Sequence, residues 1–136
     1  MSEGLKLKHG IKQMVADANT QIENLSVDEA KALLGRDDVV FVDLRDPREL
    51  EREGMIPGAF HCPRGMLEFW VDPESPYHKP VFASGKRFVF YCMSGWRSAL
   101  STKTVQDMGL PKVGHITGGF SAWRKEGGEV GPGPKA

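Results

Sequence analysis

Short apolar runs that alternate with helical segments are the feature that most limits what this chain can fold into. Residues 39–44 and 87–91 are rich in Val and aromatic side chains, and residues 113–116 are expected to form a third strand. Runs of this kind without polar alternation are typical of strands buried on both faces. Helical segments lie between them, as connections between parallel strands require. The alternation therefore predicts a layered α/β domain with a parallel sheet.

Capping signals set the ends of the helices that we expect. Ser26 and Asp46 each stand three residues before a Glu, as in a capping box, and Pro47 suits the first position of a helix. These signals predict helices over 27–34 and 47–53. Apolar spacing predicts further helices over 11–23, 97–108 and 120–126, a helical turn at 66–70 and a short strand at 59–62.

The same signals divide the chain, whose 136 residues suit one domain, into three parts. Residues 1–24 are expected to form an N-terminal helical extension, either packed on the domain or mobile. Residues 25–130 form the domain, and residues 131–136 a flexible tail rich in Gly and Pro. Within the domain, residues 71–86 have no regular pattern. A loop of that length is either a lid over a site or a surface excursion.

Composition excludes several kinds of function. Lys plus Arg and Asp plus Glu both number 18, so there is no basic excess for nucleic acid to bind. No apolar run is long enough to span a membrane, and residues 1–10 lack the apolar core of a secretory signal. Two cysteines cannot form a disulfide framework. We therefore expect a cytoplasmic protein with reduced thiols, and no nucleic acid or membrane partner.

Cys92 carries the strongest chemical signal, because it lies where a buried strand turns into a helix. Ligands of parallel sheets bind at this edge, outside the carboxyl ends of the strands. Unpaired backbone N–H groups, the helix N-terminus and Arg97 all favour a thiolate there. Gly95 allows the backbone to curl around the sulfur. The alternative is a buried cysteine that merely ends a core strand.

Four segments in order resemble the single-domain rhodanese family of sulfurtransferases. They are Asp43-Leu44-Arg45 after the first core strand, the Gly-Met-Ile-Pro-Gly-Ala turn at 54–59, the Cys-x-x-Gly-x-Arg-Ser loop at 92–98 and Gly-Gly-Phe-Ser-Ala-Trp at 118–123. The match runs from about residue 25 to 130 and leaves residues 1–24 outside it.

The resemblance implies a central parallel sheet of about five strands with helices on both faces. It also implies transfer of a sulfane sulfur from thiosulfate or a similar donor to cyanide, a thiol or a protein acceptor, through a persulfide on Cys92. No cofactor or metal is expected. Arg97 would bind the donor anion, and the loop residues Met93, Ser94, Gly95, Trp96 and Arg97 would supply the N–H groups around it. Ser98 would form a hydrogen bond across the loop.

Two further features of the resemblance concern neighbouring residues. Asp43 and Arg45 would lie near the loop and support it, although a simple ion pair at the strand end is the alternative. The His usual in the 54–59 turn is replaced by Met55. Trp96 is a large aromatic within the loop, suited to gating the pocket, contacting a protein acceptor or packing on residues 71–86.

Other functions stay open at this point. Phosphatases and arsenate reductases of similar fold use a Cys-x5-Arg loop, whereas only four residues separate Cys92 from Arg97. The shorter ring should suit a sulfur atom better than a tetrahedral oxyanion. A non-catalytic binding or sulfur-carrier module is the other alternative. Cys62 is expected to be a core residue, with a resolving thiol as the less favoured reading.

Overall fold

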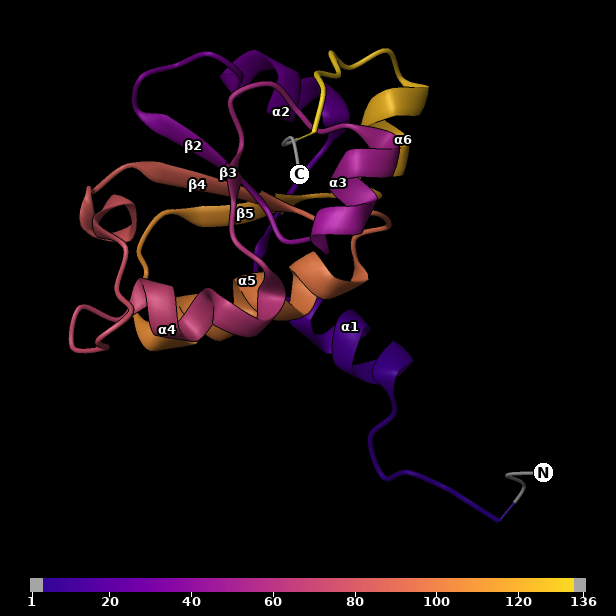
Figure 1. Cartoon of the computed structure of the whole chain (residues 1–136). Coiled ribbons are helices and arrows are strands. Elements are labelled where there is room, and N and C mark those ends of the chain that lie inside the picture. Colours follow the sequence, from indigo (N-terminus) through magenta and orange to yellow (C-terminus); the bar gives the residue numbers. More distant parts are fainter. Residues whose placement is uncertain (1–3, 134–136) are drawn as a thin grey trace.

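A computed structural model of the chain, which describes residues 4–133, contains one sheet of parallel strands (Figure 1). The strand order is β1-β5-β4-β2-β3. Every neighbouring pair is parallel, which confirms the predicted five-stranded α/β sheet. The strands are β1 (Glu23–Leu25), β2 (Val39–Asp43), β3 (Phe60–His61), β4 (Arg87–Tyr91) and β5 (Val113–Ile116).

Helices cover both faces of this sheet (Figure 1). Those on one side include α2 and α6, and those on the other include α4 and α5. The α-helices are α1 (Ile11–Asn19), α2 (Val27–Leu33), α3 (Pro47–Glu53), α4 (Leu67–Val71), α5 (Trp96–Met108) and α6 (Gly119–Lys125). Both predicted capping boxes are present, at Ser26 and at Asp46.

The central strands are buried on both faces, as their unbroken apolar runs predicted. In β4, Val89 and Tyr91 belong to the core under α2 and α6, whereas Phe88 and Phe90 belong to the core under α4 and α5. Successive side chains of a strand point to opposite faces, so one strand contributes to both cores. This double burial anchors the carboxyl end of β4, where Cys92 follows.

The N-terminal part differs from the expected three-part division. The predicted boundary between residues 24 and 25 falls inside β1, an edge strand that pairs with β5. Its three residues carry no apolar run, so only the pairing with β5 makes them a strand. Before it, Val15 and Ala18 of α1 pack against Ala99 of α5. The predicted helix is therefore a packed part of the domain.

The first residue of the predicted C-terminal tail, Gly131, is hydrogen-bonded to the rest of the domain. The backbone N–H of Gly131 donates to Met55 O at 2.8 Å, and that of Met55 donates to Gly131 O at 3.0 Å. These bonds place the start of the predicted tail beside the turn that follows α3. The last three residues of the tail, 134–136, lie outside the described residues.

The loop at 71–86 lies at the far end of α5 from Cys92. It contains a short 3₁₀ turn, Pro80–Ala83, whose Phe82 stacks on Phe88 with ring centroids 5.3 Å apart. Together with Met108, the last residue of α5, and Leu110, which follows the helix, it lines a cavity of about 510 Å³. Cys92 precedes the first turn of α5, about 20 Å away by helix length. The loop is therefore a surface excursion, not a lid over Cys92.

Candidate active site

The site forms where two neighbouring strands end at the same edge of the sheet. Asp43 at the end of β2 and Tyr91 at the end of β4 are Cα partners. The N–H of Leu44 continues the ladder by donating to Tyr91 O at 3.0 Å. Helix α3 begins shortly after β2, and α5 shortly after Cys92. The first turns of both helices are thus brought to one place.

The sulfur of Cys92 is completely buried within its own loop. Sγ accepts hydrogen bonds from the backbone N–H of Gly95 at 3.2 Å and of Ser98 at 3.4 Å, and it contacts Ser98 Oγ at 3.6 Å. Gly95 has φ +100°, which L side chains rarely adopt, and it precedes α5 directly. The turn therefore directs amides and the positive end of a 13-residue helix at the sulfur, an arrangement that favours an anion.

The outer side of the loop is held by the first turn of α6. Phe120 N–H donates to Cys92 O at 2.8 Å and Ser121 N–H donates to Met93 O at 3.0 Å. A Cβ at Gly119 would lie 2.5 Å from Cys92 O, so this close approach requires glycine. The Gly-Gly segment at 118–119 therefore lets α6 dock on the loop and fix its backbone.

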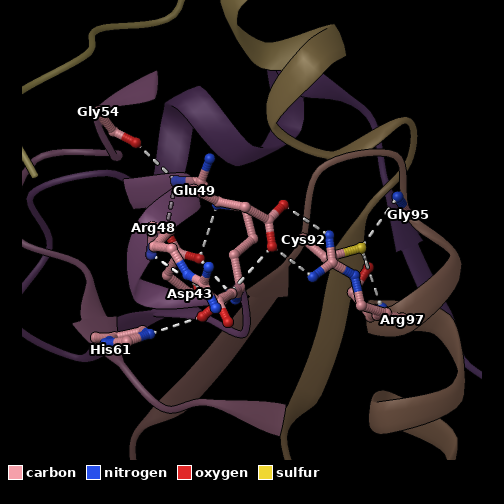
Figure 2. Close-up of polar contacts among 11 residues, drawn as sticks. Asp43, Arg48, Glu49, Gly54, His61, Cys92, Gly95 and Arg97 are labelled. Carbon is pink, nitrogen blue, oxygen red and sulfur yellow. Dashed lines mark hydrogen bonds and ion pairs between the residues drawn. The ribbon is translucent and has the colours of Figure 1, made fainter. Parts of the chain in front are cut away.

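Arg97 is held by a carboxylate from α3. Its Nη1 and Nη2 donate to the two oxygens of Glu49 at 2.8 and 2.9 Å, as Figure 2 shows beside the sulfur of Cys92. These hydrogen bonds lower the pKa of Glu49 to about 2 and raise the pKa of Arg97. An anion that binds Arg97 must therefore share or replace a bidentate partner.

The other predicted loop residues lie around this cradle without donating to the sulfur. Of the described backbone amides, only those of Gly95 and Ser98 donate to Cys92 Sγ. Ser94, Gly95 and Trp96 line a cavity of about 170 Å³ that Val15 and Asn19 of α1 also line. Trp96 is 44% exposed there, so it faces α1 and solvent rather than residues 71–86.

Asp43 and Arg45 form a buried ion pair close to the loop. Arg45 Nε and Nη2 donate to the two oxygens of Asp43 at 3.0 and 2.8 Å, and Nη2 also donates to Gly54 O at 2.7 Å. The guanidinium carbon lies 4.3 Å from the ring centroid of Phe120. Since Phe120 N–H binds Cys92 O, the ion pair is linked to the loop through α6.

The second cysteine, Cys62, lies in the core, and the adjacent His61 contacts a backbone carbonyl group. Cys62 is buried in the core under α4 and α5, and burial raises the pKa of its thiol to about 12. Nε2 of His61 lies 2.7 Å from Arg45 O. Within residues 4–133, no group of three His, Cys, Asp or Glu side chains is placed to hold a metal ion. None of the described helices has the length and apolarity to cross a membrane.

Sequence reasoning missed two residues that the fold brings to this edge. Glu49 was assigned only to a capping box, and His115 of β5, which contacts Ser98, was given no role. For Glu49 a partial signal existed, because α3 and α5 both begin after the carboxyl ends of strands and their first turns carry a Glu and an Arg. The sequence does not show that β2 and β4 are neighbours, and this adjacency is what brings Glu49 to Arg97. For His115 the sequence holds no local signal.

Comparison with known proteins places the chain among proteins of one family. The family model described as Rhodanese-like domain matches residues 26–126. Thiosulfate:glutathione sulfurtransferase of Saccharomyces cerevisiae is 30% identical over 117 residues, covering 81% of this chain and 84% of the yeast protein. A mouse protein, thiosulfate sulfurtransferase/rhodanese-like domain-containing protein 3, is 29% identical over 100 residues, 70% of this chain. The chain spans only 64% of the mouse protein.

One solved structure is much more similar. It is a Rhodopseudomonas palustris protein of unknown function, described as a possible tyrosine phosphatase. It is 58% identical to this chain, with a TM-score of 0.90, and the match covers 93% of this chain and 98% of that one. Residues 1–24, outside the family match, therefore have a counterpart for most of their length in at least one other protein.

Proposed function

This chain belongs to the rhodanese-like domain family, and we propose that it is a sulfurtransferase whose Cys92 thiolate carries the transferred sulfur. The observation that carries the proposal is the cradle at Cys92. Two backbone N–H groups and the start of α5 converge on a buried sulfur, with the guanidinium of Arg97 beside it. Such a cradle stabilises negative charge both on the attacking sulfur and on a persulfide.

In the first half-reaction, the Cys92 thiolate attacks the outer sulfur of thiosulfate or a similar sulfane donor. A new S–S bond forms at Cys92 as the donor's own bond to that sulfur breaks, and with thiosulfate as the donor, sulfite leaves with the bonding electron pair. Arg97 orients the donor anion by exchanging part of its contact with Glu49. Met93, Ser94, Gly95, Trp96 and Ser98 shape the loop around the outer sulfur.

In the second half-reaction, a thiolate acceptor or cyanide attacks the outer sulfur of the persulfide, and the Cys92 thiolate is the leaving group. The same N–H groups stabilise the thiolate as it is released. Asp43 and Arg45 support the loop through Phe120 rather than by contact with substrate. A thiol acceptor requires a reduced compartment, so we propose a cytoplasmic setting.

The rival function is phosphatase chemistry, which the description of the Rhodopseudomonas palustris relative favours. One feature of this chain weighs against it. Only four residues separate Cys92 from Arg97, one fewer than in the Cys-x5-Arg loop of those phosphatases. The shorter ring suits a single sulfur atom better than a tetrahedral phosphoryl group.

Substitution of each cysteine, followed by mass measurement of the intact protein, tests the proposal. After incubation with thiosulfate, wild type and the Cys62→Ser control should gain the mass of one sulfur atom. Cys92→Ser should gain none and lose turnover, because its hydroxyl has no accessible anion at neutral pH. Thermal unfolding checks that each variant folds.

Each alternative has its own outcome in the same set of assays. A persulfide on wild type with no transfer to cyanide or thiols would make the chain a sulfur carrier and contradict turnover. Hydrolysis of an aryl phosphate without persulfide formation would establish the phosphatase instead. Loss of turnover in Cys62→Ser with the persulfide retained would make Cys62 a resolving thiol.

A further inference from the structure

A chain of buried hydrogen bonds leads from Cys92 to a histidine on the neighbouring strand. Cys92 Sγ lies 3.6 Å from Ser98 Oγ, which lies 2.8 Å from Nδ1 of His115. On the other side of the ring, Nε2 lies 2.8 Å from Asn24 Oδ1 and 3.2 Å from Asn19 Oδ1. Ser98 and His115 are buried, with exposed fractions of 0% and 2%.

Counting donors and acceptors sets the direction of every bond in this chain. The amide nitrogen of Asn24 donates to Asn19 O at 2.8 Å and to Ile22 O at 3.2 Å, so its oxygen faces the imidazole. An amide oxygen only accepts, hence Nε2 of His115 carries the hydrogen and Nδ1 is the acceptor. The Ser98 hydroxyl must then donate to Nδ1, and its oxygen is left to accept the thiol hydrogen of Cys92.

This direction allows the network two fully paired states. In the first, a neutral thiol donates to Ser98 and Ser98 donates to a neutral His115. In the second, the thiol hydrogen has moved to Ser98 Oγ while the hydroxyl hydrogen of Ser98 has moved to His115 Nδ1. Ser98 then donates to a Cys92 thiolate and accepts from an imidazolium. A thiolate with neutral His115 would instead face a lone pair of Ser98 or leave Nδ1 without a partner, which is costly in a buried site.

We propose that His115 is a positioning residue whose Nδ1 takes up the Cys92 thiol proton through the Ser98 hydroxyl. The proposal rests on the proposed function, in which Cys92 must become a thiolate. The transfer breaks one S–H and one O–H bond, forms one O–H and one N–H bond, and leaves the net charge of the site unchanged. Both N–H groups of the imidazolium keep oxygen acceptors, namely Ser98 Oγ and Asn24 Oδ1.

The groups around the His115 ring bear on its ability to take up a proton. Burial lowers the pKa of His115 to about 4, since no counter-charge offsets the loss of water. The groups that face the ring are Ser98 from α5, Asn19 from α1 and Asn24 from β1, all uncharged. Among the described residues the cavity on the α1 side adds no charged side chain. Because these neighbours are uncharged, the ring can become an imidazolium only as a thiolate forms at Cys92, at the other end of the hydrogen-bond chain.

The test compares the pH dependence of Cys92 alkylation by iodoacetamide in wild type, His115→Gln, Ser98→Ala and the double variant. Gln can accept from Ser98 and donate to Asn24 but cannot take up a proton, so it separates proton uptake from structure. In His115→Gln we expect the midpoint of the pH dependence of alkylation to rise by about one pH unit. At neutral pH the alkylation rate should then fall roughly tenfold. The alkylation rate of Ser98→Ala should fall by a similar factor. The rate of the double variant should fall no further than that of either single variant, because both residues act in one chain. His9→Gln, at an exposed position, should match wild type.

An unmoved or lowered midpoint in His115→Gln, with thermal unfolding as in wild type, would overturn the proposal. The proposal would also be overturned if the two substitutions lowered the alkylation rate independently, so that their factors multiplied in the double variant. NMR of the His115 ring gives a second readout: at neutral pH the ring should be an imidazolium in wild type and neutral in Cys92→Ser. Persulfide formation is measured separately by mass. A chain that forms no persulfide but shows this coupled titration would refute the proposed function while keeping the relay.

Discussion

At the scale of single residues, Arg97 and Glu49 set the charge at the mouth of the site. Arg97 is 42% exposed at its side chain and Glu49 18%, so the pair lies between the buried sulfur and solvent. Its bidentate geometry holds the planar guanidinium in one orientation beside Cys92 (Figure 2). Two predictions follow from that geometry, one for each partner.

Arg97→Lys keeps the positive charge but loses the planar fork that matches an oxyanion. We expect the KM for thiosulfate to rise about fivefold or more, since a bidentate charge-assisted contact becomes a single one. The fold should be intact by circular dichroism. Steady-state kinetics with thiosulfate and cyanide provide the measurement. Kinetic constants equal to those of wild type would mean that Arg97 serves only to bind Glu49.

Glu49→Gln should remove an acid-sensitive part of the stability. Hydrogen bonds from Arg97 lower the pKa of Glu49 from 4.5 to about 2 in the folded protein. A carboxyl group with a lowered folded pKa stabilises the fold above its unfolded pKa, and that contribution is lost as pH falls from about 4.5 to about 2. The Tm of wild type should therefore fall more steeply over this range than that of Glu49→Gln. Glu51→Gln, at an exposed position of α3, is the control and should follow wild type. Parallel Tm curves for wild type and Glu49→Gln would contradict the assignment.

At the scale of elements, the start of α6 acts as a brace for the Cys92 loop. Two amides of α6 bind carbonyl groups of the loop, and glycine at 119 permits the approach. The loop's conformation therefore depends on an element that lies more than 20 residues further along the chain. The Gly-Gly segment, identified in the sequence only as part of a family motif, acquires a physical role from this contact.

Gly119→Ala should displace the loop. The added Cβ would lie 2.5 Å from Cys92 O and 2.6 Å from Met93 O, both backbone atoms that cannot move without moving the loop. We expect a lower Tm and slower alkylation of Cys92. Gly127→Ala is the matched control, because Gly127 also has positive φ but has open space around its Cβ position. The free energy of unfolding of that variant should fall only by the cost of backbone strain, about 1–3 kcal/mol. Equal effects of the two variants would mean that strain, and not the brace, matters.

At the scale of the whole molecule, the N-terminal segment is part of the packed structure. Helix α1 packs on α5, and Asn19 at its end reaches His115. Residues 4–10 precede this packing and are largely exposed. Their backbone extends away from the rest of the domain (Figure 1). The part of the chain outside the family match therefore adds to the core at the rear of the site.

Truncations at two points test that contribution. Removing residues 1–8 should leave the Tm nearly unchanged, because those described are exposed. Removing residues 1–19 deletes the buried side chains of Val15 and Ala18. A buried Val contributes about 1.5–3 kcal/mol, and each kcal/mol moves the Tm by about 2–4 °C in a domain of this size. We expect a fall of about 5 °C or more for the longer truncation. Equal Tm values would show that α1 is dispensable for stability.

The sequence by itself determined the elements whose signals are local. Strands β2 and β4 follow from runs of β-branched and aromatic residues, because double burial leaves no polar alternation. Helices α2 and α3 follow from capping boxes, whose partners are three residues apart. The location of Cys92 at the edge of the sheet follows from the strand that precedes it and the helix that begins after Gly95.

Only the tertiary structure decided the contacts between distant segments. Strand β1 has no pattern of its own and exists because β5 offers it a partner. Glu49 meets Arg97 because β2 and β4 are neighbours, and His115 meets Ser98 because β5 lies on the other side of β4. The strand order brings these partners together, whereas hydrophobic periodicity and capping act over a few residues. The position of Cys92 at the edge of the sheet was therefore readable from the sequence, but the distant groups that surround it became visible only once the sheet was assembled.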